Sequence, residues 1–281
     1  LTRFEPTDYF WDVFRFEFKF RFQKSSTYIF IALFFLFGIL LTNILGGAIT
    51  GTRVMLSSEK VLINSPFILM LMITMFGMLG IFLTASVMGF SIYRDFEYKI
   101  YPLFYTKPIS KFAYLMGRFF ANSIIVTIIL LGIGLGMLIG QYCPWLNADL
   151  FGPVHLSYYI WPYLINILPN VIFTGAIFTA LAFASRKMLP VYIGAIVVFV
   201  GYFIGMTLFN NMGTKTLAAL FDPMGLSTIA LVSQHLSVVE RNTRLIPFSG
   251  NLLWNRLIWL SVGGLLLLFT YLKFQFSQTM I

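Results

Sequence analysis

The sequence contains few of the groups on which soluble proteins and enzymes depend. Only 10% of its 281 residues are charged, and it has one cysteine and two histidines. A single cysteine excludes an internal disulfide, and so small a supply of cysteine and histidine argues against a zinc site built by this chain. A soluble domain carries about 25% charged residues. This chain cannot cover itself with polar side chains, so it is not a soluble globular protein.

Motifs for energy-consuming chemistry are absent as well. There is no G-x-x-x-x-G-K-[ST] phosphate loop and no H-E-x-x-H metallopeptidase helix. The apolar runs described below hold no ionisable residue in their interior, whereas proton-coupled carriers depend on such groups at membrane depth. Arg118 and Arg256 fall at the ends of runs, where we expect long side chains to snorkel to the interface. The chain is predicted to be no enzyme by itself, with no catalytic residue, metal or cofactor of its own.

The chain has long apolar runs instead. Hydrophobic residues make up 59% of it, and its mean hydropathy is +0.86. A bilayer core about 30 Å thick needs about 20 apolar helical residues. Five uncharged runs reach that length: Tyr28–Ile49, Pro66–Ile92, Phe119–Gln141, Ser157–Ala184 and Met188–Phe209. A sixth, Leu257–Leu272, reaches it if Leu252–Trp254 join. We therefore predict an all-α membrane protein with six transmembrane helices in residues 28–281.

The distribution of basic residues predicts the orientation of the spans. The net charge is +9. If the N-terminus is inside, thirteen Lys and Arg residues fall in inner segments and six in outer segments. Cytoplasmic loops carry the excess of Lys and Arg in membrane proteins. Both termini are therefore predicted to be cytoplasmic. The positive charge is then membrane-edge charge, and no nucleic-acid partner is needed to account for it.

Residues 1–27 form a predicted cytoplasmic segment that is rich in phenylalanine. Phe14-Arg-Phe-Glu-Phe-Lys-Phe-Arg-Phe22 alternates as a strand would, but an unpaired strand at a membrane is unfavourable. Phenylalanine also recurs every four residues from Phe10, as on one face of a helix. We predict an amphipathic helix over residues 10–23 that lies in the inner interface. The alternative is that the first span begins early with a ragged belt of aromatic residues.

The longest outer loop, residues 210–251, contains signals for local structure. Asp222-Pro-Met-Gly225 fits a type I turn. A short amphipathic helix is predicted after it from the residues Leu226, Ile229, Ala230 and Leu236. The cluster Glu240-Arg-Asn-Thr-Arg244 is interpreted as a solvated turn.

Uncharged polar residues and glycines inside the spans each allow two interpretations. Asn122, Asn166 and Asn170 either form hydrogen bonds between helices or line a substrate path. Pro169 lies between the last two and is expected to kink its span. Glycines at four-residue spacing either allow close helix packing within the chain or form a dimer face. They are Gly132, Gly136, Gly140, Gly201 and Gly205.

The inner loop at about residues 93–113 differs from the other loops. It opens with charged and aromatic residues close together: Arg94, Asp95, Glu97, Tyr98 and Lys99. Pro102 and Pro108 follow, and Ser110 is placed to cap the next helix. A short charged and aromatic helix at the inner surface suits docking to a soluble partner. A solvated connection is the alternative.

This loop resembles the signature region of type-two ABC exporter permeases. In that family an acidic residue after span two precedes a stretch like L-x-x-T-P-I-S-R, and G-R-F opens span three. Here these places hold Glu97, Leu103-Phe-Tyr-Thr-Lys-Pro-Ile-Ser-Lys111 and Gly117-Arg-Phe119, with Lys107 as an extra residue. The N-terminal surface helix, the six spans and the extracellular helices between spans five and six are also similar to that family.

The resemblance implies the transmembrane subunit of an ATP-driven exporter in the bacterial cytoplasmic (inner) membrane. Cytosolic ABC ATPases, which hold ATP and magnesium, would dock on the inner loops. A second six-span unit, identical or different, would complete the substrate path. The residues implied in coupling to the ATPase are Arg94, Asp95, Glu97, Tyr98 and Lys99. The alternative is a membrane anchor or scaffold for a partner protein without transport activity.

A narrower resemblance is to bacterial permeases fused to a zinc aminopeptidase domain. In such proteins a six-span unit begins a much longer polypeptide. The similar segments are Asn64-Ser-Pro66, Phe221-Asp-Pro-Met-Gly-Leu226, Glu240-Arg-Asn-Thr-Arg244 and Leu253-Trp-Asn-Arg-Leu-Ile-Trp259. The resemblance implies either a fragment of such a fusion or a permease that is encoded separately.

Overall fold

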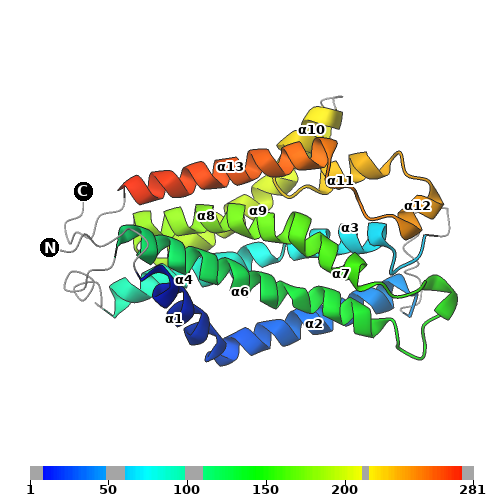
Figure 1. The fold of residues 1–281 in the computed structure, drawn as a ribbon, viewed down its shortest axis with the longest axis horizontal. Coiled ribbons are helices and arrows are strands. Elements are labelled where there is room, and N and C mark those ends of the chain that lie inside the picture. Colours follow the sequence, from blue (N-terminus) through cyan, green and yellow to red (C-terminus); the bar gives the residue numbers. More distant parts are fainter. Residues whose placement is uncertain (1–8, 49–60, 99–109, 211–214, 274–281) are drawn as a thin grey trace.

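The computed structural model of the chain describes residues 9–48, 61–98, 110–210 and 215–273. In these ranges the chain consists of helices joined by loops and contains no β-strand (Figure 1). The long helices are α2 (Ser25–Leu45), α4 (Gly80–Glu97), α6 (Lys111–Gly140), α8 (Leu168–Ser185), α9 (Met188–Asn210) and α13 (Gly250–Lys273). The shorter elements are α1 (Phe10–Phe22), α3 (Pro66–Gly77), a 3-10 turn (Ala148–Leu150), α7 (Leu156–Pro162), a π-helix (Tyr163–Ile167), α10 (Lys215–Phe221), α11 (Leu226–Ser233) and α12 (Val238–Thr243).

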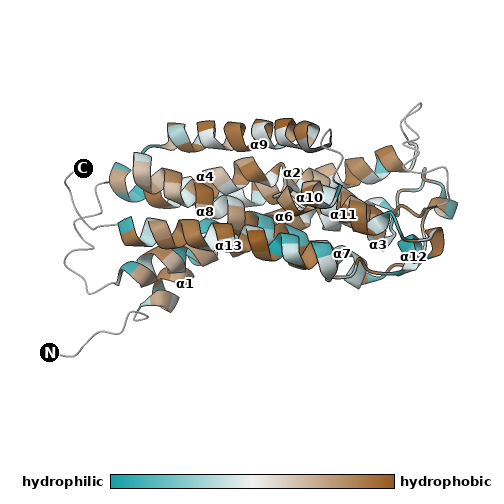
Figure 2. Cartoon of the chain, turned by 90° about the horizontal axis from the view of Figure 1, so that it is seen from above, coloured by the Kyte–Doolittle hydropathy of each residue, from teal (hydrophilic) through white to brown (hydrophobic). Residues whose placement is uncertain are grey.

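Five helical stretches are long and apolar enough to cross a membrane. They are α2, α6, the continuous stretch Leu156–Ser185, Met188–Leu208 of α9, and α13. The pair α3 and α4 makes a sixth if it is counted as one bent span. Hydrophobic residues run along the length of the long helices, and hydrophilic ones gather mainly toward the ends of the bundle (Figure 2). The predicted all-α architecture is confirmed, and the chain has the helices of an integral membrane protein.

Polar caps begin two of these helices where the sequence leaves a loop. The hydroxyl of Ser65 accepts a hydrogen bond from the backbone N–H of Ile68, and Pro66 occupies the first helical position. Ser110 caps α6 in the same way, through the N–H of Ala113, as its sequence predicted. Because α6 begins at this cap, it starts eight residues before the uncharged run and carries Arg118 inside the helix.

The second predicted span is not one straight helix. α3 ends at Gly77, α4 begins at Gly80, and the two axes differ by 49°. Glycines flank the break because neighbouring side chains occupy the space beside it. A Cβ atom on Gly80 would lie 2.7 Å from a methyl group of Leu130 on α6. The uniform apolar run gave no sign of this bend.

The fourth span contains a widened turn. Pro162 lies inside α7, Pro169 lies in the first turn of α8, and a π-helix of five residues joins them. Proline removes a backbone donor and crowds the preceding turn, and insertions of this kind relieve such crowding. The irregularity predicted at Pro169 therefore takes the form of a π-helix that precedes it.

Between α9 and α13 the described residues form three short helices, and α11 is the short helix that was predicted after the turn. The predicted turn at Asp222–Gly225 joins α10 to α11, and its Gly225 has a φ of +80°. The predicted solvated turn at Glu240–Arg244 is wrong for most of its length, because α12 runs to Thr243. Ser237 and Glu240 form a reciprocal capping box that starts this helix.

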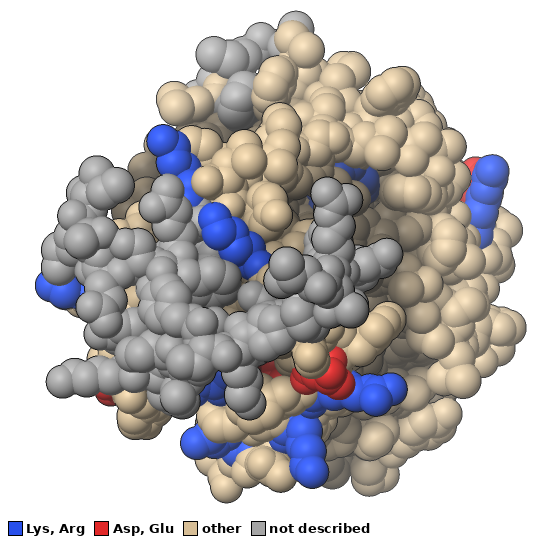
Figure 3. Space-filling model, turned by 60° about the vertical axis from the view of Figure 1, so that its left-hand side comes forward, with Lys and Arg blue, Asp and Glu red and all other residues tan. Residues whose placement is uncertain are grey.

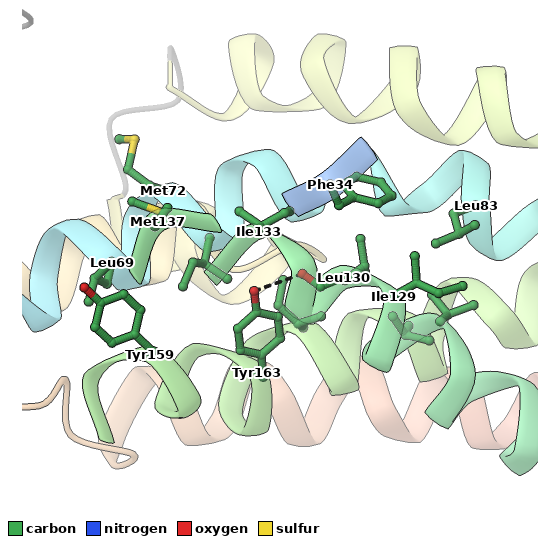
Figure 4. Packing of buried hydrophobic residues seen from close by; sticks show 14 of the residues in the cluster. Phe34, Leu69, Met72, Leu83, Ile129, Leu130, Ile133, Met137, Tyr159 and Tyr163 are labelled. Atoms are coloured by element: carbon green, nitrogen blue, oxygen red, sulfur yellow. Dashed lines mark hydrogen bonds between the residues drawn. The ribbon is translucent and has the colours of Figure 1, made fainter. Parts of the chain in front are cut away.

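The hydrophobic interior lies mainly around α6. Figure 4 shows part of it, where residues of α2, α3, α4, α6 and α7 meet and the Tyr163 hydroxyl donates a 3.0 Å hydrogen bond to the carbonyl of Leu130. A second buried group joins α4, α8, α9 and α13. By contrast, α9 exposes a row of large apolar side chains, including Val197 (64% exposed) and Ile204 (57%). Such a surface requires lipid or another protein beside it.

Candidate functional site

Charged side chains are buried together where α1, α4 and α6 meet, at one end of the bundle (Figure 1). We call this group the ion cluster; its members are Glu17, Arg21, Arg94, Asp95 and Arg118. Each is at most 9% exposed, and Glu17 is fully buried. One sequence prediction is therefore wrong, because Arg118 is buried in the ion cluster and does not snorkel to an interface. The members of the ion cluster lie outside the uncharged apolar runs, which hold no ionisable residue.

Glu17 joins helix α1 to the rest of the bundle. Its carboxylate lies 2.9 Å from the guanidinium of Arg94 on α4 and 3.8 Å from that of Arg21 one turn along α1. Asn122 on α6 donates a 3.5 Å hydrogen bond to the same carboxylate. One buried carboxylate thus contacts all three helices. A separation of four residues places Glu17 and Arg21 on the same face of α1.

Asp95 is the second carboxylate of the ion cluster, and Arg118 binds both of its oxygens. The two guanidinium nitrogens of Arg118 lie 2.7 and 3.2 Å from them. The hydroxyl of Tyr114, one turn before Arg118, donates a 2.6 Å hydrogen bond to Asp95. A two-pronged contact of arginine with a carboxylate fixes orientation as well as distance. It therefore holds the end of α4 against the first turns of α6.

Backbone carbonyls of α4 are further hydrogen-bond partners of the guanidinium groups in the ion cluster. Arg21 donates a 2.5 Å hydrogen bond to the carbonyl of Val87, and Arg118 donates one of the same length to the carbonyl of Ser91. The Arg94 guanidinium also lies over the ring of Phe20, 4.2 Å from its centroid. The alternating phenylalanines of α1 thus contribute both apolar packing and a face for a cation.

The ion cluster holds three guanidinium groups and two carboxylates, so it carries one excess positive charge. Burial lowers the pKa of Arg21 to about 10, and neighbouring Glu17 opposes that shift. Arg21 therefore stays charged at neutral pH. Removing one partner of a buried ion pair costs about 3–5 kcal/mol because the other charge is left uncompensated. The ion cluster should accordingly keep α1, α4 and α6 together.

A small cavity borders the ion cluster between α4, α6 and α8. Its volume is about 10 Å³, and Ser91, Asn122 and Thr179 are among its lining residues. The hydroxyl oxygens of Ser91 and Thr179 and the amide oxygen of Asn122 are buried, and none has a hydrogen-bond partner in the part of the chain that the structure describes. The cavity has about the size and polarity that one water molecule requires.

The predicted coupling residues divide into two groups. Arg94 and Asp95 are buried in the ion cluster, whereas Glu97 and Tyr98 at the end of α4 are exposed, Tyr98 by 63%. Lys99 lies outside the described residues. An outside partner can therefore reach Glu97 and Tyr98, one turn from side chains that are fixed to α1 and α6. Around this end of the bundle, basic side chains outnumber acidic ones (Figure 3).

A second buried polar group lies near the start of α13, toward the opposite end. We call it the Arg256 cluster; its members are Asn166, Asn170, Asp222, Asn255 and Arg256. Arg256 is 1% exposed and donates hydrogen bonds to the side chains of Asn170 (2.6 Å) and Asn255 (2.9 Å). The sequence predicted that Arg256 snorkels to the interface. This is wrong, because α8, α13 and the 222–225 turn surround its side chain.

The Arg256 cluster holds the segment between α9 and α13 in place. The Asn255 amide donates hydrogen bonds of 2.8–3.0 Å to three carbonyls near the end of α10. The Asp222 carboxylate accepts backbone hydrogen bonds from Met224, Gly225 and Ser227. The predicted Asp-Pro-x-Gly turn is therefore part of a buried network, and its neighbour is an arginine from another helix.

The polar residues predicted inside the spans hydrogen-bond between helices. Asn166 donates to the Thr74 hydroxyl and to the carbonyl of Met224, both at 3.0 Å, and Asn170 donates to that same carbonyl at 3.1 Å. Asn122 donates to the carbonyl of Arg118 as well as to Glu17. A role along a substrate path stays a prediction for all three.

The two sets of predicted packing glycines lie in different surroundings. Gly132, Gly136 and Gly140 of α6 face α2; a Cβ on Gly132 would lie 2.9 Å from the carbonyl oxygen of Ile31. They pack within the chain. Gly201 and Gly205 of α9 have no atom within 4 Å of such a Cβ among the residues described. Within the described part of the chain, the α9 pair therefore serves no close helix packing.

In the residues described, these features define an all-helical fold with helices long and apolar enough to span a membrane and with two buried polar clusters. No known protein family matches the chain, and neither does any curated protein or solved structure. The resemblance to exporter permeases thus rests on the quoted residues alone.

Proposed function

We propose that the chain is the six-span permease unit of an ATP-driven exporter. The observation that supports this most directly is the end of α4. Glu97 and Tyr98 are exposed there, and the preceding turn is joined by buried ion pairs to α1 and α6. A movement of a partner bound at Glu97 would reach three helices at once. A flexible tether would not need such connections.

The partners follow from the same arrangement. Cytosolic ABC ATPases, with their ATP and magnesium, would contact the exposed end of α4 and the loop after it. A second six-span unit would cover the apolar face of α9, where Gly201 and Gly205 leave room for close approach of another helix. Both termini and this loop would lie on the cytoplasmic side of a bacterial inner membrane.

The test is a charge reversal at the proposed contact. Glu97→Lys should leave insertion and folding unchanged, because Glu97 is exposed, but should reduce the amount of ATPase that co-purifies or the ATP hydrolysis that depends on transport. Lys187→Glu is the matched control, since Lys187 is an exposed charge at the same end of the bundle. Co-purifying chains are identified by mass spectrometry in mild detergent, and hydrolysis is measured on the purified complex.

The outcomes separate the exporter from the scaffold. Loss of ATPase binding or coupling in Glu97→Lys alone supports the proposal. A bound ATPase and an unchanged transport rate in Glu97→Lys would reject the coupling role. A stable partner without ATPase activity would instead favour a membrane anchor.

A further inference from the structure

A cavity opens among the ends of α4, α8 and α13, at the same end of the bundle as the ion cluster. Its volume is about 330 Å³. Its wall is mainly apolar, and the cations Arg186 and Lys273 belong to its lining, with no acidic residue among the residues that line it. Phe96, Ala184 and Phe269 belong to the apolar part of the lining.

We propose that this cavity binds an anionic phospholipid, with the phosphate between Arg186 and Lys273 and the start of an acyl chain along α8 and α13. The proposal requires that the chain lie in a membrane, but it does not depend on transport or on an ATPase. It assigns a lipid of net negative charge, because the cavity offers two cations and no carboxylate.

Arg186 is held at the cavity by its backbone and by an aromatic ring. It ends α8 in the left-handed conformation, with a φ of 53°. Its guanidinium lies 5.1 Å from the centroid of the Phe96 ring on α4. Lys273 is the last residue of α13 and is exposed. Among the described residues, neither cation forms an ion pair with a carboxylate, so both charges are available to a ligand.

The apolar wall distinguishes this cavity from a binding site for free phosphate. Phe269 and Ala184 line the cavity and remain exposed, and the outward face of α13 beside them is apolar. A cavity of this volume is at the small end of the range for ligand pockets, roughly 300–1,000 Å³. It therefore suits a lipid headgroup and the adjoining part of a chain, while the rest of the lipid stays in the bilayer. Basic pockets between spanning helices bind anionic headgroups in this way.

The experiment measures lipid retention by native mass spectrometry. The purified chain, with any partner chains that co-purify, is given equal amounts of phosphatidylglycerol and phosphatidylcholine in detergent. The test variant is Arg186→Asn with Lys273→Gln, since asparagine tolerates the left-handed conformation. Lys187→Gln is the matched control, because it removes the adjacent charge, which does not line the cavity. Ala184→Trp fills the cavity without removing charge.

The wild-type chain should retain phosphatidylglycerol in preference to phosphatidylcholine. The double variant should lose this preference by about thirtyfold, as expected for two basic groups near a membrane surface, and Lys187→Gln should keep it. Ala184→Trp should reduce retention of both lipids. A preference that survives the double variant, or retention that survives Ala184→Trp, would overturn the proposal. Displacement of the lipid by millimolar inorganic phosphate would do so as well.

Discussion

The substitution Glu17→Gln tests whether the ion cluster fastens α1 to the bundle. It keeps the size of the side chain but removes its charge, so the cluster changes from one excess positive charge to two. Arg94 loses its 2.9 Å partner, and Arg21 loses its only carboxylate within 4 Å among the described residues. Breaking a buried pair in this way costs about 3–5 kcal/mol.

Hydrogen exchange on the amides of α1 measures this cost locally. A loss of about 3–5 kcal/mol corresponds to exchange that is roughly a hundredfold to several thousandfold faster in α1, because 1.4 kcal/mol is a factor of ten. The amides of α8 should change little, since that helix contains no member of the ion cluster. Asp12→Asn is the control, because Asp12 is an exposed acid of the same helix.

A second substitution separates charge imbalance from simple loss of contact. The combination of Glu17→Gln with Arg94→Gln restores the original excess of one positive charge. Its effect should therefore be clearly smaller than the sum of the two single effects. If Glu17→Gln accelerated exchange in α1 no more than Asp12→Asn does, or if the two effects simply added, the electrostatic explanation would be refuted.

Three further predictions concern other parts of the fold. Gly136→Ala should destabilise the chain by about 1–3 kcal/mol through overpacking against α2. Gly201→Ala should instead stabilise the isolated chain by roughly 0.5–1 kcal/mol, because glycine is unfavourable in the middle of a helix. Thermal unfolding in detergent compares the two variants. Gly225→Ala should cost at least about 1–2 kcal/mol because its φ is positive, and faster hydrogen exchange in α11 should accompany the loss. Hydrogen bonds from the backbone and the side chain of Ser237 lower the pKa of Glu240, so the cap of α12 should be intact at neutral pH and lost as the pH falls through the folded-state pKa of Glu240. NMR of α12 measures this, and a pH response that is the same after Glu240→Gln would contradict it.

The helices could be predicted from the sequence because five uncharged apolar runs reach the length that a membrane requires, and the sixth reaches it with Leu252–Trp254 added. Their ends could not be predicted from the same signal. The uncharged apolar runs end at the first charged residue, whereas α4 continues through Arg94 and Asp95, and α6 begins before Arg118. A helix does not end at a charge if that charge has a buried partner. The cap at Ser110 was the available sign that α6 begins early.

The ion cluster could not be predicted from the sequence, for a physical reason. Its pairs join residues that are far apart in the chain, such as Glu17 with Arg94, and one sequence does not reveal which helices are neighbours. The four-residue spacing of Glu17 and Arg21 was a local sign that α1 has a polar face turned to protein. The sequence analysis predicted only that this helix lies in the inner interface of the membrane. The predicted contact with an ATPase stays a prediction, and the sequence did not separate exposed Glu97 from buried Asp95.

Each of the two polar clusters attaches one half of the bent second span, α3 or α4, to neighbouring elements. The ion cluster binds α4 to α1 and α6, while the hydrogen bond from Asn166 to Thr74 binds α3 to the π-helix and, through Met224, to the 222–225 turn. The 49° bend lies between these two attachments. In water-free surroundings, polar contacts are costly to break, so each half should keep its own neighbours. If a partner moves the end of α4, the helices attached to the ion cluster should move with it, and the displacement should concentrate at the bend. A structure of the complex with an unchanged bend angle and a shifted α4 end would contradict this, because α3 would then have moved with α4 and away from its own neighbour Asn166.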